Sequence, residues 1–140
     1  MSNYHFETPS LDMDPKVQTF FQDFYAASDA PHAHEQYAQY FTHDATLILA
    51  SKKVQGRNEI IALRKSMWEK VSSRLHKPIK VFPFGSNSNE VMLYGTVKYG
   101  LKDGGDKEVD WAARANLVNE EGKARMSFYQ VYLDTAAQAK

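Results

Sequence analysis

The hydrophobic period of this chain changes near Pro78, and this change sets the strongest limit on its fold. Before Pro78, apolar residues recur every three or four positions, the spacing of one face of an α-helix. After Pro78, apolar and polar residues alternate, which is typical of strands with one buried face. Helices followed by a meander of strands predict an α+β domain, with the helices gathered on one side of a curved antiparallel sheet.

Three helices are expected before the period changes. The first begins at Asp14-Pro15, an N-cap residue followed by a proline at the first helical position, and runs to about Ser28. A shorter helix is expected over residues 33–41. The third follows Gly56 and is the strongest local pattern. Its apolar residues at helical spacing are Ile60, Leu63, Met67, Trp68, Val71 and Leu75.

Five strands are expected, and the turn clusters GSNSN, KDGGD and NEEGK separate the last four into antiparallel hairpins. The predicted strands are Ala45 to Ser51, Ile79 to Phe84, Val91 to Lys102, Glu108 to Val118 and Arg125 to Asp134. A chain of 140 residues has room for one domain. We therefore expect a single domain over residues 1–140 with its core over about 14–134, and loosely held ends before and after it.

The charge balance and the absence of cysteine exclude several classes of protein. The chain has 17 basic and 17 acidic residues, so no overall positive field attracts nucleic acid or an anionic membrane surface. The lack of cysteine excludes disulfides and thiolate metal sites, and predicts a reducing, cytoplasmic compartment. Neither a signal peptide nor a membrane span is expected, because no apolar run is long enough.

No metal and no cofactor is expected. None of the five histidines has a companion at ligand spacing, and no glycine-rich phosphate-binding motif is present. His76, placed near the end of the third helix, is interpreted as complementing the helix dipole, with a position at a pocket rim as the alternative. The nearby basic residues are interpreted as a solvated face; they are Arg64, Lys65, Lys70, Arg74, Lys77 and Lys80.

Aromatic residues make up 13% of the chain and must line a core, a pocket or an interface. Several lie on the inward faces of the predicted helices, where a plain core is the simpler interpretation. Tyr25, Tyr40 and Trp68 also carry polar groups that suit a half-polar cavity, so they are candidate substrate-binding residues.

The order of elements and three segments, HDATLILA, GRNEIIALRKSMW and DWAARANLVNEEGKARMSFYQVYLD, resemble the nuclear transport factor 2-like superfamily, in particular its SnoaL-like branch. The resemblance implies a cone-shaped, curved antiparallel sheet wrapped around three N-terminal helices and enclosing an apolar pocket. It also implies either cofactor-free isomerase, cyclase or dehydratase chemistry, or binding without catalysis. Fold alone does not decide between these.

The resemblance also assigns candidate site residues. Leu49 stands where ketosteroid isomerases carry their general base, and Arg114 stands where they carry the second oxyanion donor. Tyr129 stands where SnoaL cyclases carry an acid. The comparison places Arg114 on the concave face of its strand and Trp111 on the convex face. From the residues alone, the polar side of this strand could equally be a wet outer surface.

The last hairpin decides which side chains join Arg114. If NEEG closes a four-residue loop, Arg114 faces Ser127 and lies diagonal to Tyr129; a three-residue loop shifts this register. In the first case Arg114 stabilises an oxyanion, Tyr129 and Asn116 donate hydrogen bonds, and Asp110 is the nearest acid or base. The predicted substrate-binding residues are Tyr25, Tyr40, Leu49, Trp68, Asn116 and Ser127.

These observations predict a cofactor-independent enzyme of secondary-metabolite type. Its partner would be a small, apolar, oxygenated molecule that it cyclises, isomerises or dehydrates. The alternative is a non-catalytic small-molecule-binding or dimerisation module of the same fold. A homodimer is expected through the convex face of the strand Glu108 to Val118, because its apolar residues would otherwise form a large exposed apolar patch. The residues of that predicted interface are Val109, Trp111, Ala113 and Leu117.

Overall fold

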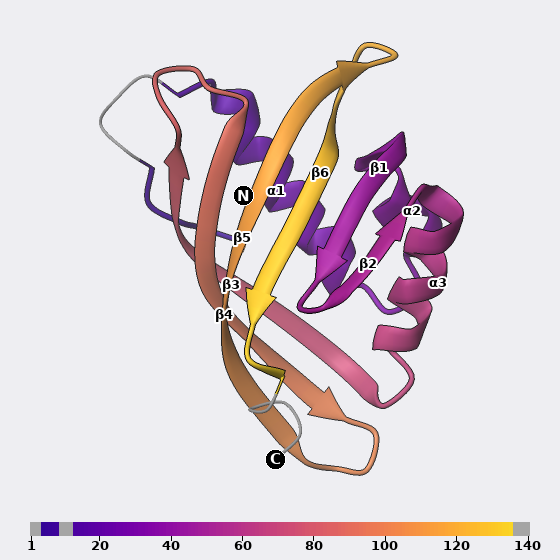
Figure 1. Ribbon diagram of the computed structural model, residues 1–140. Helices are drawn as coiled ribbons and strands as arrows, with labels where there is room; N and C mark the ends of the chain where they lie inside the picture. Colours follow the sequence, from indigo (N-terminus) through magenta and orange to yellow (C-terminus); the bar gives the residue numbers. More distant parts are fainter. Residues whose placement is uncertain (1–3, 9–12, 136–140) are drawn as a thin grey trace.

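The computed structural model describes residues 4–8 and 13–135, and its centre is a six-stranded curved sheet. The strands are β1 (Phe41–Leu49), β2 (Lys52–Gln55), β3 (Val71–Pro83), β4 (Glu90–Leu101), β5 (Asp106–Glu120) and β6 (Lys123–Leu133). The helices are α1 (Pro15–Asp29), α2 (His34–Ala38) and α3 (Arg57–Met67). The predicted α+β fold is confirmed: the N-terminal helices pack beside a curved sheet that does not close into a barrel (Figure 1).

The sheet order is β2-β1-β6-β5-β4-β3, and all neighbours are antiparallel except β1 and β6. The predicted antiparallel hairpins are therefore present from β3 to β6. The parallel contact of β1 with β6 was not expected, nor was β2. Strand β2 forms one edge of the sheet, and α3 connects it to β3 at the opposite edge. The strands β3 to β6 then return across the sheet, so that β6 lies beside β1.

Helix α1 fills the concave side of the sheet, and its predicted start is confirmed. The Asp14 carboxylate accepts a hydrogen bond from the backbone N–H of Lys16 at 3.0 Å, and Pro15 occupies the first turn. The inward stripe of the helix is almost entirely aromatic. Phe24 contacts the ring of Tyr129 on β6 at 5.2 Å between centroids, so helix and sheet share one core.

The third helix is shorter than its apolar spacing predicts. It ends at Met67, and Val71 and Leu75 belong to β3 instead. Leu75 is 54% exposed, so it never contributed to a buried helical stripe. A β-branched residue and two serines at positions 71–73 favour an extended chain, and pairing with β4 overrides the helical spacing.

The N-terminal segment is also held more firmly than expected. The Glu7 N–H donates to the Ile79 carbonyl at 2.7 Å, and the Glu7 carbonyl accepts from Val81 at 3.2 Å. Phe6 is buried in the main core. Residues 4–8 therefore extend the edge of β3, whereas most of the tail predicted after Asp134 lies outside the described residues.

Strand β5 presents its faces the opposite way from the prediction. Val109, Trp111, Ala113 and Leu117 point into the core, and Trp111 is only 4% exposed. Arg114 therefore lies on the convex outer face. The predicted dimer surface was wrong for the same reason, because its residues are the inner lining of the cone. A strand read one residue out of phase exchanges its two faces completely.

The β5–β6 turn explains the error in register. It contains two residues, Glu121 and Gly122, with φ of 56° and 79°, which is the geometry of a type I′ turn. With a bulge at Ser127, Arg114 then pairs with Gln130, so it faces neither Ser127 nor Tyr129. The four-residue loop, and the cluster built on it, were wrong.

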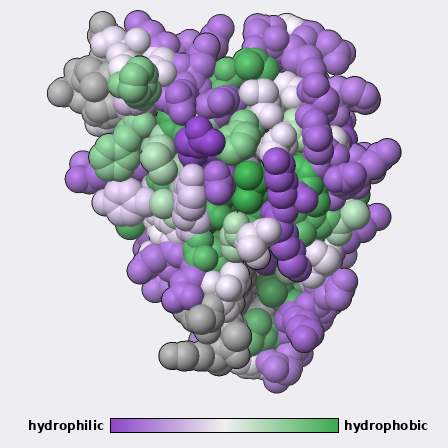
Figure 2. All heavy atoms as spheres, in the orientation of Figure 1, coloured by the Kyte–Doolittle hydropathy of each residue, from purple (hydrophilic) through white to green (hydrophobic). Residues whose placement is uncertain are grey.

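Polar side chains cover most of the face shown in Figure 2, and apolar side chains gather near its centre. Among the described residues, the large apolar side chains that remain most exposed come mainly from β3, β4 and β6. They include Phe82, Phe84, Met92, Tyr94 and Tyr132.

Gly95 is required where β3 bends against β4. A Cβ atom at this position would lie 2.2 Å from the Lys77 carbonyl oxygen, and the neighbouring Pro78 marks a shift of register in β3. We predict that Gly95→Ala lowers the free energy of unfolding by about 2–3 kcal/mol, because backbone atoms must move to admit the methyl group.

Gly85→Ala is the matched control, since no atom lies within 4 Å of the Cβ built there. Urea denaturation of both variants measures the effect. Equal stability of the two would contradict the described β3–β4 contact.

Candidate active site

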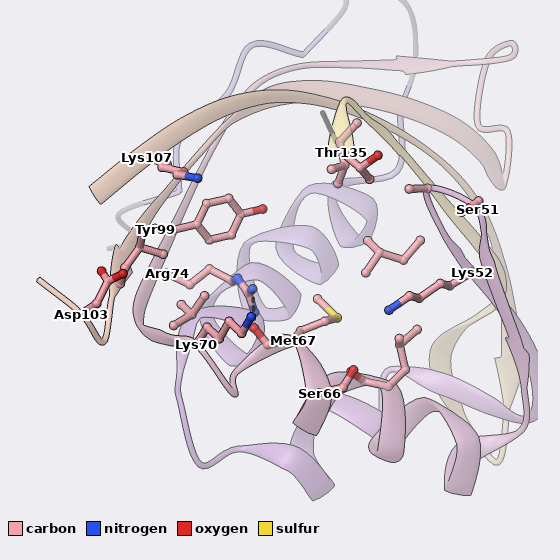
Figure 3. A pocket seen from close by; sticks show the side chains of 16 residues that line it. Ser51, Lys52, Ser66, Met67, Lys70, Arg74, Tyr99, Asp103, Lys107 and Thr135 are labelled. Carbon is pink, nitrogen blue, oxygen red and sulfur yellow. Dashed lines mark hydrogen bonds between the residues drawn. The ribbon is translucent and has the colours of Figure 1, made fainter. Parts of the chain in front are cut away.

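The open end of the cone contains a cavity of about 540 Å³ between α3, β3, β4 and the turn that joins β1 to β2 (Figure 3). Its walls are mainly apolar. Figure 3 shows Arg74 between Tyr99 and Met67, and Lys52 reaching in from the other side. The apolar lining residues are Leu49, Leu63, Met67, Val71, Leu101 and Leu133.

A smaller inner chamber of about 40 Å³ adjoins this cavity. Leu49, Met67, Arg74, Tyr99 and Leu133 line both spaces, so the two share one wall. The other residues around the inner chamber include several with polar groups: Ser28, Tyr37, His76, Trp111 and Tyr129. A ligand entering from the cavity would meet these groups at its inner end.

His76 is held by Asp29, the last residue of α1. Its ring Nδ1 lies 2.6 Å from Oδ1 of Asp29, and its backbone N–H donates to Oδ2 at 2.9 Å. An ionised carboxylate only accepts hydrogen bonds, so it fixes a proton on Nδ1 and leaves Nε2 for a ligand. The same carboxylate accepts from the Tyr4 hydroxyl at 2.7 Å. The dyad is therefore held by three hydrogen bonds and is mostly buried, with side-chain exposures of 16% for His76 and 7% for Asp29.

Two tyrosines meet beside the histidine. The hydroxyls of Tyr25 and Tyr129 lie 2.9 Å apart, and the Tyr25 ring contacts the ring of His76 at 5.1 Å. Burial raises the pKa of both phenols, so both remain protonated at neutral pH. The pair carries two protons and uses one in its mutual hydrogen bond. When Tyr25 is the donor of that bond, the Tyr129 proton is available to an oxygen atom in the chamber that Tyr129 lines.

Arg74 stands where the cavity meets the inner chamber. It is 8% exposed, and its guanidinium lies 4.8 Å from the Trp68 ring and 5.0 Å from the Tyr99 ring. Nη2 donates to the Met67 carbonyl at 3.1 Å, and the Tyr99 side chain also hydrogen-bonds to Arg74. Nη1 is buried without a hydrogen-bond partner among the described residues. Burial lowers the pKa of Arg74, yet a guanidinium remains charged at neutral pH.

This arrangement can be compared with known proteins. No family model matches the sequence, and no curated protein matches it. Nuclear transport factor 2 from Cryptosporidium parvum superimposes with a TM-score of 0.69 at 17% identity, covering 89% of this chain and 100% of that one. The chain has the nuclear transport factor 2-like fold.

Two further structures share this NTF2-like fold. ActVI-ORFA from Streptomyces coelicolor has a TM-score of 0.72 at 17% identity, covering 86% of this chain and 97% of that one. A scytalone dehydratase-like protein from Novosphingobium aromaticivorans has a TM-score of 0.69 at 14% identity, covering 84% and 81%. Other similar structures are of proteins with unknown function, so the likeness is one of fold.

Two of the residues predicted for the site line this NTF2-like cavity, and two others lie one layer behind it. Tyr129 lines the inner chamber and Leu49 lines both spaces. Tyr25 reaches the chamber through its hydrogen bond to Tyr129. Trp68 packs on Arg74 and is buried.

The remaining predicted residues lie elsewhere. Arg114 pairs with Glu90 at 3.5 Å on the convex face, over the ring of Phe128. Asp110 and Asn116 share that face of β5, because they alternate with its inward residues. The structure thus does not bring the predicted catalytic group together.

Two more predicted residues are also separated from the cavity. Ser127 is the bulge residue of β6. Tyr40 packs against Phe20 and Phe24 and lines a shallow depression outside the cone.

The residues that the sequence interpretation missed are Asp29, Arg74 and His76. Arg74 was assigned to the solvated face of a helix, because the predicted third helix ran too far. His76 was assigned to the end of that helix, with a position at a pocket rim as the alternative. Arg74, His76 and Pro78 alternate along β3, and this period of two is the signal that places these three residues on one inward face. The solvated-face interpretation also failed for Arg64, which is 1% exposed.

Neither a membrane-spanning helix nor a group of metal-binding side chains is found among the described residues. Over residues 4–8 and 13–135, no helix combines the length and apolar character needed to cross a bilayer. Within the same ranges, no three His, Asp or Glu side chains gather in a group that could hold a metal ion.

The buried tyrosines predict a loss of stability at alkaline pH. Burial raises the pKa of Tyr37 to about 12, and it raises those of Tyr25 and Tyr129 as well. A phenol with a raised folded-state pKa has its full stability below pH 10, near the unfolded value, and loses it as the pH rises toward the folded value. The unfolding free energy should therefore fall between pH 10 and 12.

Tyr37→Phe should make that fall less steep, by up to roughly 1.4 kcal/mol per pH unit. The exposed Tyr132→Phe variant is the control, and urea denaturation at pH 9, 10 and 11 is the measurement. An unchanged slope in Tyr37→Phe would contradict the buried position of its hydroxyl.

Proposed function

We propose that this domain is a cofactor-independent enzyme that moves a proton on a small, largely apolar, oxygenated molecule. The observation that carries the proposal is the Asp29–His76 dyad at the inner end of an apolar cavity. A histidine held by a carboxylate at one ring nitrogen is suited to take or give a proton at the other. The reaction class is that of an isomerase, a dehydratase or a cyclase.

The proposed chemistry uses only side chains of this chain. Nε2 of His76 removes a proton from a carbon next to a carbonyl group, and the C–H electron pair becomes an enolate. The spare O–H of the Tyr25–Tyr129 pair donates to the enolate oxygen. Where a C=C bond extends the conjugation, the enolate takes the proton back from His76 at another carbon. Otherwise it expels a β-hydroxyl that leaves as water with that proton, or attacks an internal carbonyl carbon, whose new alkoxide takes the proton from His76.

The similar structures support the same class without deciding it. Two of them are ActVI-ORFA and a scytalone dehydratase-like protein, and others have no known function. Leu49 lines the cavity where a general base was considered from the sequence. In our proposal His76 takes that role from a different strand, which removes the main argument for a non-catalytic binding module.

We predict that the protein catalyses hydrogen–deuterium exchange at the α-carbon of 2-tetralone, an apolar ketone, followed by NMR in deuterated buffer. His76→Gln keeps the ring position polar and removes the base, so exchange should fall by roughly 10²–10⁴-fold. Asp29→Asn should lower it as well, because the amide no longer fixes the tautomer.

His43→Gln is the control, since His43 is exposed on β1. Exchange equal to that of buffer for the native protein, or equal rates for the native protein and His76→Gln, would contradict the proposed function.

We also propose a homodimer, through a different surface from the one predicted. The convex face carries Phe82 stacked on Tyr94, and Met92 beside them, with exposures of 52%, 38% and 40%. Arg114 and Glu90 border this patch with opposite charges. A two-fold contact would bring the cation of one copy to the carboxylate of the other, so the surface is self-complementary. This observation favours a second role as a dimerisation module.

The dimer is tested by sedimentation velocity at tens of micromolar protein. The native chain should sediment at twice its mass of 16.0 kDa. Met92→Lys should sediment as a monomer, because a two-fold interface would bring the new lysines of both copies into one apolar patch. Lys98→Glu, exposed on the same strand, is the control. A native monomer would contradict the proposal.

A further inference from the structure

Arg74 carries a hydrogen-bonding group that the fold leaves unused. A buried cation needs acceptors on its N–H groups, since leaving them unmatched costs free energy. The Met67 carbonyl accepts from Nη2, and the Tyr99 side chain also hydrogen-bonds to Arg74, but Nη1 has no partner within the described residues. No salt bridge of Arg74 is present in the described part of the chain either.

Arg64 shows how the same domain treats a guanidinium that has only a structural role. It donates to the carbonyls of Ala27, Ser28 and Ala30 and to the ring of His34. The end of α1 is thereby capped. The contrast is between a saturated buried arginine behind the cavity wall and an unsaturated one on that wall.

The surroundings of Arg74 select an anion of a particular kind. Its guanidinium is flanked by the rings of Trp68 and Tyr99, which restrict approach to the edge of the planar group. Three lysines and one carboxylate, Asp103, are the other charged side chains around the cavity, so its local charge is positive. Those lysines are Lys52, Lys70 and Lys107. A planar carboxylate matches the edge of a guanidinium and can accept two N–H bonds.

Arg74 and His76 are two residues apart on β3 and share its inward face. Their Cα atoms are therefore about 6.6 Å apart, at roughly 3.3 Å per residue. We infer that the substrate is an apolar oxo- or hydroxy-acid: its carboxylate binds Arg74, and its reacting carbon, a few bonds away, lies at His76. The inference rests on the proposed function for the fate of the substrate, but the binding step stands without it.

The test compares 4-phenylbutanoate with 4-phenylbutanamide, which has a similar shape and no charge, by isothermal titration calorimetry. The native protein should bind the acid at least about tenfold more tightly than the amide. Arg74→Met should remove this preference and leave affinity for the amide within about threefold. Arg114→Met is the matched control and should keep the preference, because Arg114 lies outside the cone.

Two further measurements separate a ligand-binding role from a structural one. Arg74→Met removes an unsatisfied buried donor together with the Met67 hydrogen bond and two ring contacts, so these effects offset each other. It should melt within about 4 °C of the native protein, whereas loss of a purely structural arginine would lower the melting temperature further. Arg74→Lys should recover only part of the preference, since an ammonium lacks the planar edge. Raising salt from about 0.05 to 0.3 M should change the preference less than threefold, because Arg74 is buried.

Equal binding of acid and amide by the native protein, binding of neither at millimolar concentration, or a preference that survives in Arg74→Met would overturn the inference. His76→Gln distinguishes it from the proposed function. If that variant keeps native exchange activity while Arg74→Met loses the acid preference, the acid site stands and the catalytic proposal fails. If His76→Gln loses exchange while the native protein shows no preference for the acid, the catalytic proposal stands and the acid site fails.

Discussion

The carboxylate of Asp29 connects three parts of the chain that are distant in sequence. It accepts hydrogen bonds from the backbone and ring of His76 on β3 and from Tyr4 in the N-terminal segment. Because Asp29 ends α1, these bonds fix the helix relative to the bend of the sheet. Hydrogen bonds to a charged acceptor are stronger than neutral ones, and removing a buried acceptor strands its donors. The position of the inner chamber therefore depends on this one side chain.

Strand β3 then supplies the chemistry, because alternate residues of a strand share a face. Arg74 and His76 point inward from neighbouring inward positions, and the long curved strand carries them from the cavity to its inner end. The aromatic residues of α1 pack in the core beside the dyad, where the Tyr25 ring contacts His76. Tyr25 belongs to both groups, since it packs in the core and bonds to Tyr129. Core and site are thus one continuous set of contacts.

Local patterns were sufficient to predict much of the fold. The cap at Asp14, the aromatic stripe of α1 and the alternation of β4 to β6 depend on near neighbours, so the sequence alone identified them. The helix predicted past Met67 failed because pairing of β3 with β4 outweighs the helical spacing of Val71 and Leu75. Such pairing is a long-range contact that local spacing does not contain.

The site was harder to predict than the fold for the same reason. The resemblance assigned Arg114 to the inner face of β5, whereas Trp111 and its alternating neighbours face inward. The two-residue turn at Glu121–Gly122 and the bulge at Ser127 then pair Arg114 with Gln130 in place of Ser127. The Asp29 carboxylate beside Nδ1 holds the proton of His76 on that nitrogen. A long-range ¹H–¹⁵N spectrum of the histidine rings at pH 8, assigned with His76→Gln, measures this directly. We expect the Nδ1–H tautomer for His76 in the native protein, and its conversion in Asp29→Asn. An Nε2–H tautomer in the native protein would contradict it.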